Sequence, residues 1–319
     1  MKQILLIMPL SYNYNLEIID VLENNGYKVT FIPDFDESIL KRSIRYLSSS
    51  LIKKIQNRYI RHQINLLKNN KFDKIIIIRG YAYDYEQINY IKNKYKNAFM
   101  VMYQWDPMSI SMFDSKAIPL FDKCYSFDKT DCIKFVSFEY LPLFYKKESG
   151  TNLNVLYDFS FVGAVHSNRL EVLSKLIPQL DAKGYNYRII VTTNKLKYYL
   201  GRLKKYPGYR EFPKDMILFT PLPRLEVQKI FQQSRVIIDI NHPLQSGLSI
   251  RVIEVLSKRK RLLTTNKSIE EDVFYDPLVI GIIKNNELPL NIEELVTSNS
   301  FVDISILEVN NWVKKVADI

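Results

Sequence analysis

Short runs of apolar residues, separated by longer segments of helical periodicity, constrain the fold of this 319-residue chain more than any other feature. Four such runs occur in the first half, at Ile4–Met8, Lys28–Ile32, Lys74–Ile78 and Phe99–Tyr103. Helical patterns lie between them, around Leu16–Asn24, Leu40–Lys68 and Tyr85–Lys94. Strands that are apolar throughout are buried on both faces, and the helices between them serve as crossover connections. The first half is therefore predicted to be an α/β domain with a parallel sheet.

The same alternation begins again after the polar segment Lys146–Asn154. Further strands are predicted at Asp158–Gly163, Tyr187–Val191, Met216–Phe219, Val236–Ile240 and Arg261–Thr264, with a helix at Arg169–Leu180. Gly26 and Gly184 each follow a predicted helix and precede a predicted strand, as glycine does when it ends a helix in the left-handed conformation. We predict two Rossmann-like α/β domains that face a cleft, at residues 1–150 and 151–303. One continuous sheet is the less favoured alternative, because the segment between the halves is polar.

Residues 304–319 are predicted to form a C-terminal helix, because Leu307, Trp312, Val313 and Val316 recur at roughly helical spacing. Two placements are open. The helix either covers the second domain or crosses back to the first.

The segment Gly247–Leu256 is predicted to be a glycine-led turn that opens an amphipathic helix. A helix N-terminus offers unpaired N–H groups and a partial positive charge, so it is suited to phosphate. Arg251 can neutralise that phosphate, and Glu254 can accept hydrogen bonds from sugar hydroxyls. This combination suits a nucleotide-sugar. The alternative is a solvated stripe of ion pairs formed by Arg251, Glu254 and Lys258.

A second candidate phosphate contact follows the strand that ends near Gly163. The loop from Ala164 runs into a helix at Arg169, with Asn168 and Glu171 as a capping pair or Ser167 as the cap. Arg169 then lies where a donor phosphate can meet it, or else is only a solvated residue of the first turn.

The segments Tyr157–Gly163, Asn168–Arg169 and Arg251–Glu254 resemble the C-terminal domain of bacterial group-1 glycosyltransferases, in particular the spore-maturation-like and polysaccharide-biosynthesis subset. The resemblance covers roughly residues 155–275 and implies the GT-B fold, in which the C-terminal domain holds the nucleotide-sugar donor. It also implies that the terminal helix crosses back. Related retaining enzymes carry a Glu-x7-Glu pair, whose second member matches Glu254, whereas its first falls on Ser246. That departure leaves the stereochemistry open.

Loops at strand ends supply the remaining donor-side candidates. The resemblance implies that Pro221 and Leu222 contact the nucleotide base, and His166 and His242 are further possible contacts to phosphate or sugar. The predicted donor-binding residues are Gly163, His166, Asn168, Arg169, Thr192, Pro221, Leu222, Ser246, Gly247, Leu248, Ser249, Arg251 and Glu254.

Asp106 is the first candidate on the acceptor side, because it follows the strand Phe99–Tyr103 and precedes a proline that restricts the turn. A carboxylate there can accept the proton of an acceptor hydroxyl. Asp128 and Asp131 are better explained as helix caps or turn residues. The predicted catalytic residues are therefore Asp106 and Glu254.

Composition excludes several other classes of function. No Gly-x-Gly-x-x-Gly or Walker motif is present, and we expect a metal-independent transferase with no cofactor besides its nucleotide-sugar substrate. The net charge of +11 suits an anionic membrane surface or nucleic acid, but no nucleic-acid motif accompanies it, so nucleic acid is not an expected partner. Cys124 and Cys132 are expected to be ordinary buried or half-buried thiols.

These observations predict a cytoplasmic glycosyltransferase, with possible contact to the inner membrane leaflet. It would transfer sugar from a nucleotide-sugar to a bacterial surface glycan or glycolipid. A non-catalytic protein of the same shape, which binds nucleotide or acts as a scaffold in glycan assembly, is the alternative.

Overall fold

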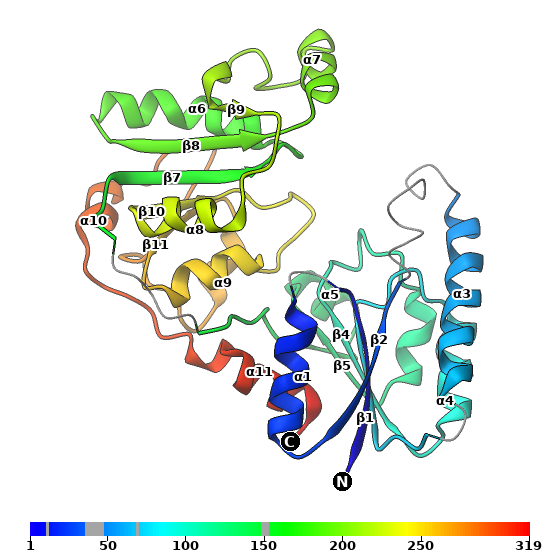
Figure 1. The fold of residues 1–319 in the computed structure, drawn as a ribbon. Coiled ribbons are helices and arrows are strands. Elements are labelled where there is room, and N and C mark those ends of the chain that lie inside the picture. The colour runs from blue at the N-terminus through cyan, green and yellow to red at the C-terminus, as the bar shows by residue number, and fades with distance from the viewer. Residues whose placement is uncertain (11–12, 36–47, 68–69, 148–152) are drawn as a thin grey trace. The chain divides into compact units, whose positions relative to one another are not determined.

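A computed structural model describes the chain except for residues 11–12, 36–47, 68–69 and 148–152. Two compact units divide it: unit 1 comprises Met1–Lys146 and Ile306–Ile319, and unit 2 comprises Lys147–Ser305 (Figure 1). Each unit has its own sheet of six strands, so the alternative of one continuous sheet is wrong.

Unit 1 is built on a parallel sheet in the order β2-β1-β3-β4-β5-β6. Its strands are β1 (Gln3–Met8), β2 (Lys28–Pro33), β3 (Lys74–Ile78), β4 (Phe99–Gln104), β5 (Lys123–Ser126) and β6 (Phe138–Tyr140). Its helices are α1 (Tyr14–Asn24), α3 (Ser49–Leu66), α4 (Tyr85–Lys94), η2 (Ser115–Leu120), α5 (Lys129–Lys134), η5 (Ser305–Leu307, which begins one residue before the unit) and α11 (Val309–Ala317).

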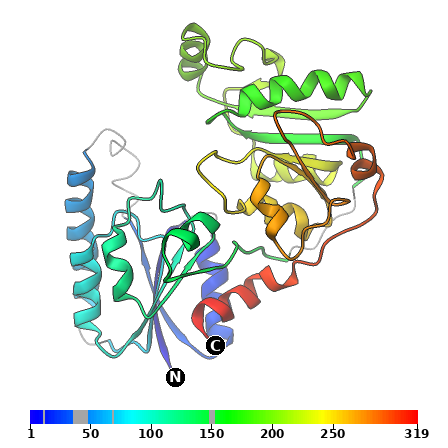
Figure 2. The ribbon, with the colours of Figure 1, turned by 180° about the vertical axis from the view of Figure 1, so that it is seen from behind.

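Helices cover both faces of this sheet, as Figure 1 and the reverse view in Figure 2 show. On one face, Ile60 and Ile64 of α3 and Ile88 of α4 join a core with Leu5 and Ile77 of the strands. On the other face lie α1 and α11. Burial on both faces explains why β1 and β3 are apolar throughout.

The C-terminal helix α11 packs on unit 1, as the crossing alternative predicts. The indole of Trp312 donates to the carbonyl of Pro142 at 3.0 Å, and its ring meets Tyr103 edge-on, 4.6 Å between centroids. The segments that leave and re-enter unit 1 also pair, through Tyr145 N to Leu307 O at 3.0 Å and Val309 N to Tyr145 O at 2.9 Å. The placement of this helix on the second domain is therefore wrong.

Unit 2 has a parallel sheet in the order β12-β11-β10-β7-β8-β9. Its strands are β7 (Tyr157–Ala164), β8 (Tyr187–Thr192), β9 (Ile217–Leu218), β10 (Ser234–Asp239), β11 (Arg261–Thr264) and β12 (Ile280–Ile282). Its helices are α6 (Arg169–Ala182), α7 (Lys195–Leu203), η3 (Lys214–Met216), α8 (Arg224–Gln232), α9 (Ile250–Ser257), η4 (Lys267–Glu271) and α10 (Ile292–Thr297).

Two identical helix endings confirm the internal echo of the sequence. Gly26 has φ +84° after α1, and Gly184 has φ +70° after α6. In each case the following tyrosine donates back to a leucine carbonyl, Tyr27 to Leu22 at 3.2 Å and Tyr185 to Leu180 at 3.1 Å. The left-handed residue reverses the chain into the next strand, and glycine adopts this conformation without strain.

Predicted elements differ from the observed ones mainly at their ends. The helix predicted at Leu40–Lys68 spans Ser49–Leu66, while residues 36–47 and 68–69 lie outside the described part of the chain. Residues 148–152 of the predicted linker also lie outside it.

Both cysteines are free thiols, as expected. Cys124 is buried and Cys132 half-buried, and burial raises the pKa of the first to about 12 and of the second to about 11. Among the helices that the structure describes, none combines the length and the hydropathy that a membrane span needs.

Candidate functional site

The strand order of unit 2 reverses between β7 and β10, which lie side by side although β8 and β9 separate them in the chain. Ligands of doubly wound sheets bind at the carboxyl ends of the strands at such a switch point. The loops at residues 165–168 and 240–249 leave the sheet there. Several predicted donor-side residues therefore lie in the two loops where the topology favours ligand binding.

Arg169, the first residue of α6, bridges the two sides of this switch point. Its Nε donates to the carbonyl of Ile240 at 3.0 Å, and its Nη1 donates to the carbonyl of Ala164 at 3.0 Å. Burial and the nearby charge of Arg251 lower the pKa of Arg169 to about 10, while Asp239 acts in the opposite direction. The guanidinium is therefore cationic at neutral pH and is held by neutral carbonyl groups.

Arg251, the second residue of α9, lies against the same aromatic ring as Arg169. Its guanidinium carbon is 5.9 Å from the centroids of both Phe161 and Phe231, and that of Arg169 is 5.7 Å from Phe161. Within the described part of the chain, Arg251 forms no hydrogen bond or ion pair. Two partly buried cations repel each other, and an anion bound beside them removes that cost. The pair is suited to a phosphate or diphosphate group.

His166 adds a neutral donor to this positive cluster. Burial, followed by the charge of Arg169, lowers the pKa of His166 to about 4, so its imidazole is uncharged at neutral pH. Its ring centroid lies 6.0 Å from that of His242, whose Nδ1 accepts from the backbone N–H of Leu244 at 3.2 Å. Both loops of the switch point thus contribute a histidine.

Gly163 leaves the space that the Arg169 guanidinium occupies. A Cβ at this position would lie 2.9 Å from Cζ of Phe161 and 3.2 Å from Nη1 of Arg169. Since Gly163 lies inside β7, its function is close approach by a side chain and not an unusual backbone conformation.

The loop before α9 is held by side chains that donate to its carbonyl groups. Nδ2 of Asn266 donates to the carbonyls of Ser246 at 2.9 Å and Gly247 at 3.3 Å, and Ser268 also donates to that of Ser246. Nε2 of Gln245 reaches the Gly247 carbonyl at 2.9 Å. These bonds turn the carbonyl oxygens of the loop toward the protein.

The start of α9 differs from the predicted glycine-led turn. Ser249 is the cap: its Oγ accepts from Val252 N at 3.4 Å and donates to Oδ1 of Asp239 at 3.3 Å. Gly247 lies two residues before this cap, and the Leu248 side chain is fully buried. The whole residue Leu248 is 0% exposed, so it presents no surface to a ligand.

Glu254 faces α8 and not Arg251. Its Oε1 lies 3.5 Å from Nη2 of Arg224, and the two side chains are 37% and 48% exposed. Both line a pocket of about 70 Å³ between α8 and α9, together with Val227 and Phe231. Arg251 and Glu254 therefore form no ion pair with each other, and Glu254 instead takes part in a partly exposed pair with Arg224.

The capping pair predicted for α6 is also wrong. Asn168 precedes the helix but makes no capping hydrogen bond, because its backbone, at φ −95° and ψ 13°, is not extended as a cap requires. Ser167 has φ +45° and its hydroxyl lies 3.0 Å from Nδ1 of His166. Glu171 pairs instead with Lys175 at 3.0 Å.

The remaining donor-side candidates are not in contact with this arginine cluster. Thr192 ends β8, and its carbonyl accepts from Val165 N at 2.8 Å. Pro221 is exposed and Leu222 half-buried in the connection from β9 to α8. Their role in binding stays a prediction.

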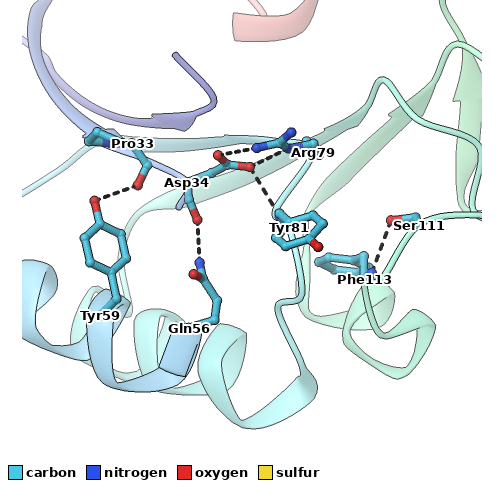
Figure 3. Close-up of polar contacts among 8 residues, drawn as sticks. All are labelled: Pro33, Asp34, Gln56, Tyr59, Arg79, Tyr81, Ser111 and Phe113. Carbon is cyan, nitrogen blue, oxygen red and sulfur yellow. Dashed lines mark hydrogen bonds and ion pairs between the residues drawn. The ribbon is translucent and has the colours of Figure 1, made fainter. Parts of the chain in front are cut away.

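A second polar cluster, which the sequence did not reveal, lies at the carboxyl end of the sheet in unit 1 (Figure 3). Asp34 follows β2 and Arg79 follows β3, and the two form a bidentate pair at 2.7 and 2.8 Å. The side chain of Asp34 is 1% exposed and that of Arg79 is 21% exposed. Each of these two charged residues directly follows a predicted strand. The same feature led to the prediction of Asp106, so it could also have indicated Asp34 and Arg79.

The loop after β3 is strained. Arg79 has φ +69°, Gly80 +61° and Ala82 +58°, and left-handed conformations cost non-glycine residues about 1–3 kcal/mol each. The Asp34 carboxylate fixes this loop, because it accepts from Tyr81 N at 3.3 Å as well as from Arg79. Such strain concentrates at functional sites.

Asp106 follows β4, at the same edge of the sheet. It is half-buried, and among the residues that the structure describes it forms no hydrogen bond or ion pair. Burial raises the pKa of Asp106, and the charge of Arg79 acts in the opposite direction. The turn that carries it is anchored by Asp131, whose two carboxylate oxygens accept from Met108 N at 3.1 and 3.0 Å.

Asp128 and Asp131 have structural functions, as predicted. Asp128 caps α5 by accepting from Thr130 N at 3.0 Å. Asp131 accepts from the hydroxyl of Ser126 at 2.9 Å and is 3% exposed.

Within the described residues, no group of three His, Cys, Asp or Glu side chains is placed to hold a metal ion.

Neither a protein-family model nor a curated protein sequence matches this chain. Solved structures do match over nearly its whole length. They include the apo structure of OtsA, with a TM-score of 0.63 and 11% identity over 100% of this chain and 98% of that one. UDP-GlcNAc 2-epimerase from Methanocaldococcus jannaschii matches with a TM-score of 0.56 and 11% identity over 100% and 99%. The lipopolysaccharide outer core galactosyltransferase WaaB matches with a TM-score of 0.50 and 12% identity over 99% and 96%.

The fold is GT-B. Two doubly wound α/β units with parallel sheets confirm the fold class that the sequence predicts. Unit 2 is the half that the sequence resemblance implies binds the donor, which stays a prediction, and unit 1 carries the terminal helix.

Proposed function

We propose that this protein is a glycosyltransferase that transfers a sugar from a nucleotide-sugar bound by unit 2 to a glycan acceptor bound by unit 1. The acceptor is a bacterial surface glycan, carried on a lipid. The single observation that carries the proposal is the pair of cations, Arg169 and Arg251, that share the ring of Phe161 at the switch point of unit 2. The sequence resemblance adds the polysaccharide-biosynthesis and spore-maturation-like group as its family.

Each donor-side residue has a distinct task in this proposal. Arg169 and Arg251 neutralise the diphosphate, and neutral His166 donates a hydrogen bond to it. Glu254 accepts hydrogen bonds from the ribose hydroxyls beside the pocket between α8 and α9. The base lies against Pro221 and Leu222.

Transfer breaks the bond between the anomeric carbon and the diphosphate oxygen, whose electron pair stays with the leaving nucleoside diphosphate. The two arginines stabilise the charge that develops there. A bond forms between the acceptor oxygen and the anomeric carbon, and Asp106 takes the hydroxyl proton. Burial raises the pKa of Asp106, which makes its carboxylate a stronger base. No metal takes part, so transfer continues in the presence of a chelator.

Thermal-shift measurements with UDP-, GDP-, CMP- and ADP-sugars test donor binding before the acceptor is known. A matching nucleotide-sugar at a hundred times its Kd stabilises the protein by about 2.7 kcal/mol. Arg251→Gln removes the cation and is expected to weaken binding by about 10- to 150-fold, the value of one or two charge-assisted hydrogen bonds. Arg188→Gln, at an exposed position on β8, is the matched control. Equal affinity of the Arg251 variant and the control contradicts the proposal, as does the absence of binding by every nucleotide-sugar.

A non-catalytic nucleotide-binding protein is the second candidate, and Ser246 is the observation that favours it. This residue takes the place of the first glutamate of related enzymes, and its carbonyl is held by Asn266 and Ser268. Release of nucleoside diphosphate in the presence of an acceptor extract separates the two candidates, since only a transferase releases it with glycan extension. Analysis of the recovered sugar also separates transfer from epimerisation, the activity named for the M. jannaschii structure.

A further inference from the structure

Helix α7 (Lys195–Leu203) presents two opposite faces. Toward the core of unit 2 it turns Tyr198, which is 2% exposed, and Gly201. Gly201 lies so close to Tyr209 that a Cβ would be 2.2 Å from its ring. This contact fixes the rotation of the helix about its axis, so the opposite face is turned outward at one end of unit 2 (Figure 1).

The outward face of α7 is apolar. Leu196, Tyr199, Leu200 and Leu203 follow one another at helical spacing and are 68%, 59%, 43% and 75% exposed. We call these four side chains the apolar stripe. A helix that covers a globular core normally turns polar residues outward, so this arrangement reverses the usual one.

Cations lie along both sides of the apolar stripe. At 100° per residue, Lys195 and Arg202 fall on one side of it, and Lys197 and Lys204 fall on the other. Lys197 donates to the carbonyl of Val165 at 2.9 Å and Arg202 to the hydroxyl of Tyr198 at 2.9 Å, so Lys195 and Lys204 are the better placed of the four to meet lipid phosphates. Residues 195–210 contain six Lys or Arg residues and no Asp or Glu. The apolar stripe is thus flanked by positive charges and by no negative ones.

We propose that α7 binds the surface of an anionic lipid bilayer. The apolar stripe enters the boundary between headgroups and acyl chains, and the flanking cations meet lipid phosphates. Tyr199 suits this depth, because tyrosine is enriched at membrane interfaces. A second copy of the chain fits less well, since a symmetric contact between two α7 helices brings like charges together. The proposal is independent of the glycosyltransferase activity.

Flotation with vesicles tests the apolar stripe. The full chain is expected to float with vesicles of equal parts phosphatidylglycerol and phosphatidylcholine at low salt, and not with phosphatidylcholine alone. The double variant Leu200→Gln/Leu203→Gln is expected to bind at least tenfold more weakly. Leu225→Gln, on α8 and 79% exposed against 75% for Leu203, is the matched control and retains wild-type binding. These side chains are exposed, so their substitution should leave the fold intact. Melting temperatures of the variants verify this.

The charges are tested in the same assay. Each Lys or Arg near an anionic surface strengthens binding about fivefold, so Lys195→Gln/Lys204→Gln is expected to lose at least tenfold. Lys96→Gln/Lys116→Gln removes the same net charge from exposed positions of unit 1 and retains binding. A tryptophan placed at Tyr199 shifts its emission to the blue when the vesicles are added.

Three results overturn the proposal. The first is that the wild-type chain does not bind the anionic vesicles, and the second is that both double variants of α7 bind as well as their controls. The third is that the Leu200→Gln/Leu203→Gln variant changes the sedimentation of the lipid-free protein while vesicle binding is unchanged, which assigns the stripe to a protein contact.

Discussion

Replacement of Arg79 by Met removes the bidentate cation from the buried carboxylate of Asp34 in unit 1. Asp34 is 1% exposed, and Tyr81 N, at 3.3 Å, still donates to it after the change. Breaking a buried pair by removing one partner costs about 3–5 kcal/mol. Methionine has a similar side-chain length and is equally strained at φ +69°. The change in stability therefore reports on the loss of the positive charge.

The two substitutions of the pair, made singly and together, form a double-mutant cycle, and the substitution of Asp34 gives the sharper test. Asp34→Asn leaves Arg79, which is 21% exposed and can reach water, so its cost should be smaller, about 1.5–3 kcal/mol. In the Arg79→Met background, Asp34→Asn removes the uncompensated charge and should restore about 2 kcal/mol. One and the same substitution therefore changes sign with its partner.

Hydrogen exchange is the suitable assay, because a chain with two units need not unfold in one step. Protection of amides in β1 and β3 reports on unit 1, and protection in β10 of unit 2 serves as an internal reference. Lys315→Met, which removes the exposed pair with Glu139 at 3.8 Å in the same unit, is the control and should cost about 1 kcal/mol or less. If the effects of Asp34→Asn and Arg79→Met simply add, the pair is not coupled and the reasoning fails.

Two further predictions concern the switch point of unit 2. Gly163→Ala should leave the fold intact but displace the Arg169 guanidinium, which lies 3.2 Å from the new Cβ, and should weaken nucleotide-sugar binding about tenfold; unchanged affinity in calorimetry would contradict the proposed spacing. Burial and the neighbouring positive charges lower the pKa of His166 to about 4, so between about pH 6.5 and 4 the unfolded chain binds a proton that the folded protein does not. Stability should therefore fall with pH across this window by more in the wild type than in His166→Gln, as measured by urea unfolding at pH 7.5 and 5.0.

Much of the fold was predictable because its buried strands leave a strong local signal. The strand at Lys74–Ile78 and the helix at Tyr85–Lys94 have the predicted bounds. Elements of two to four residues, such as β6 and β12, are too short to show periodicity. The helix α7 was not predicted for a different reason: its outward apolar face has the same spacing as an inward one, and only Tyr198 and Gly201 show which face is buried.

The candidate site was less accessible from sequence, because its contacts join distant positions. Asp34 and Arg79 are 45 residues apart, and only the adjacency of β2, β1 and β3 brings them together. Arg251 and Glu254 share a helix, and their spacing alone favours an ion pair. Packing instead turns Arg251 toward Phe161 and Glu254 toward Arg224. Both partners lie on other elements, so the sequence of α9 alone does not predict these contacts.

The polar clusters at the carboxyl ends of the two sheets have opposite electrostatic character. In unit 1 the guanidinium of Arg79 is compensated by Asp34, and Asp106 adds a further carboxyl group. In unit 2 the guanidinium of Arg169 is held by two carbonyl oxygens, with Arg251 beside it. An anionic ligand is therefore attracted to unit 2, whereas unit 1 is suited to a neutral ligand whose hydroxyl group can donate to a carboxylate. This difference is the physical reason to assign the diphosphate of a donor to unit 2 and the hydroxyl of an acceptor to unit 1.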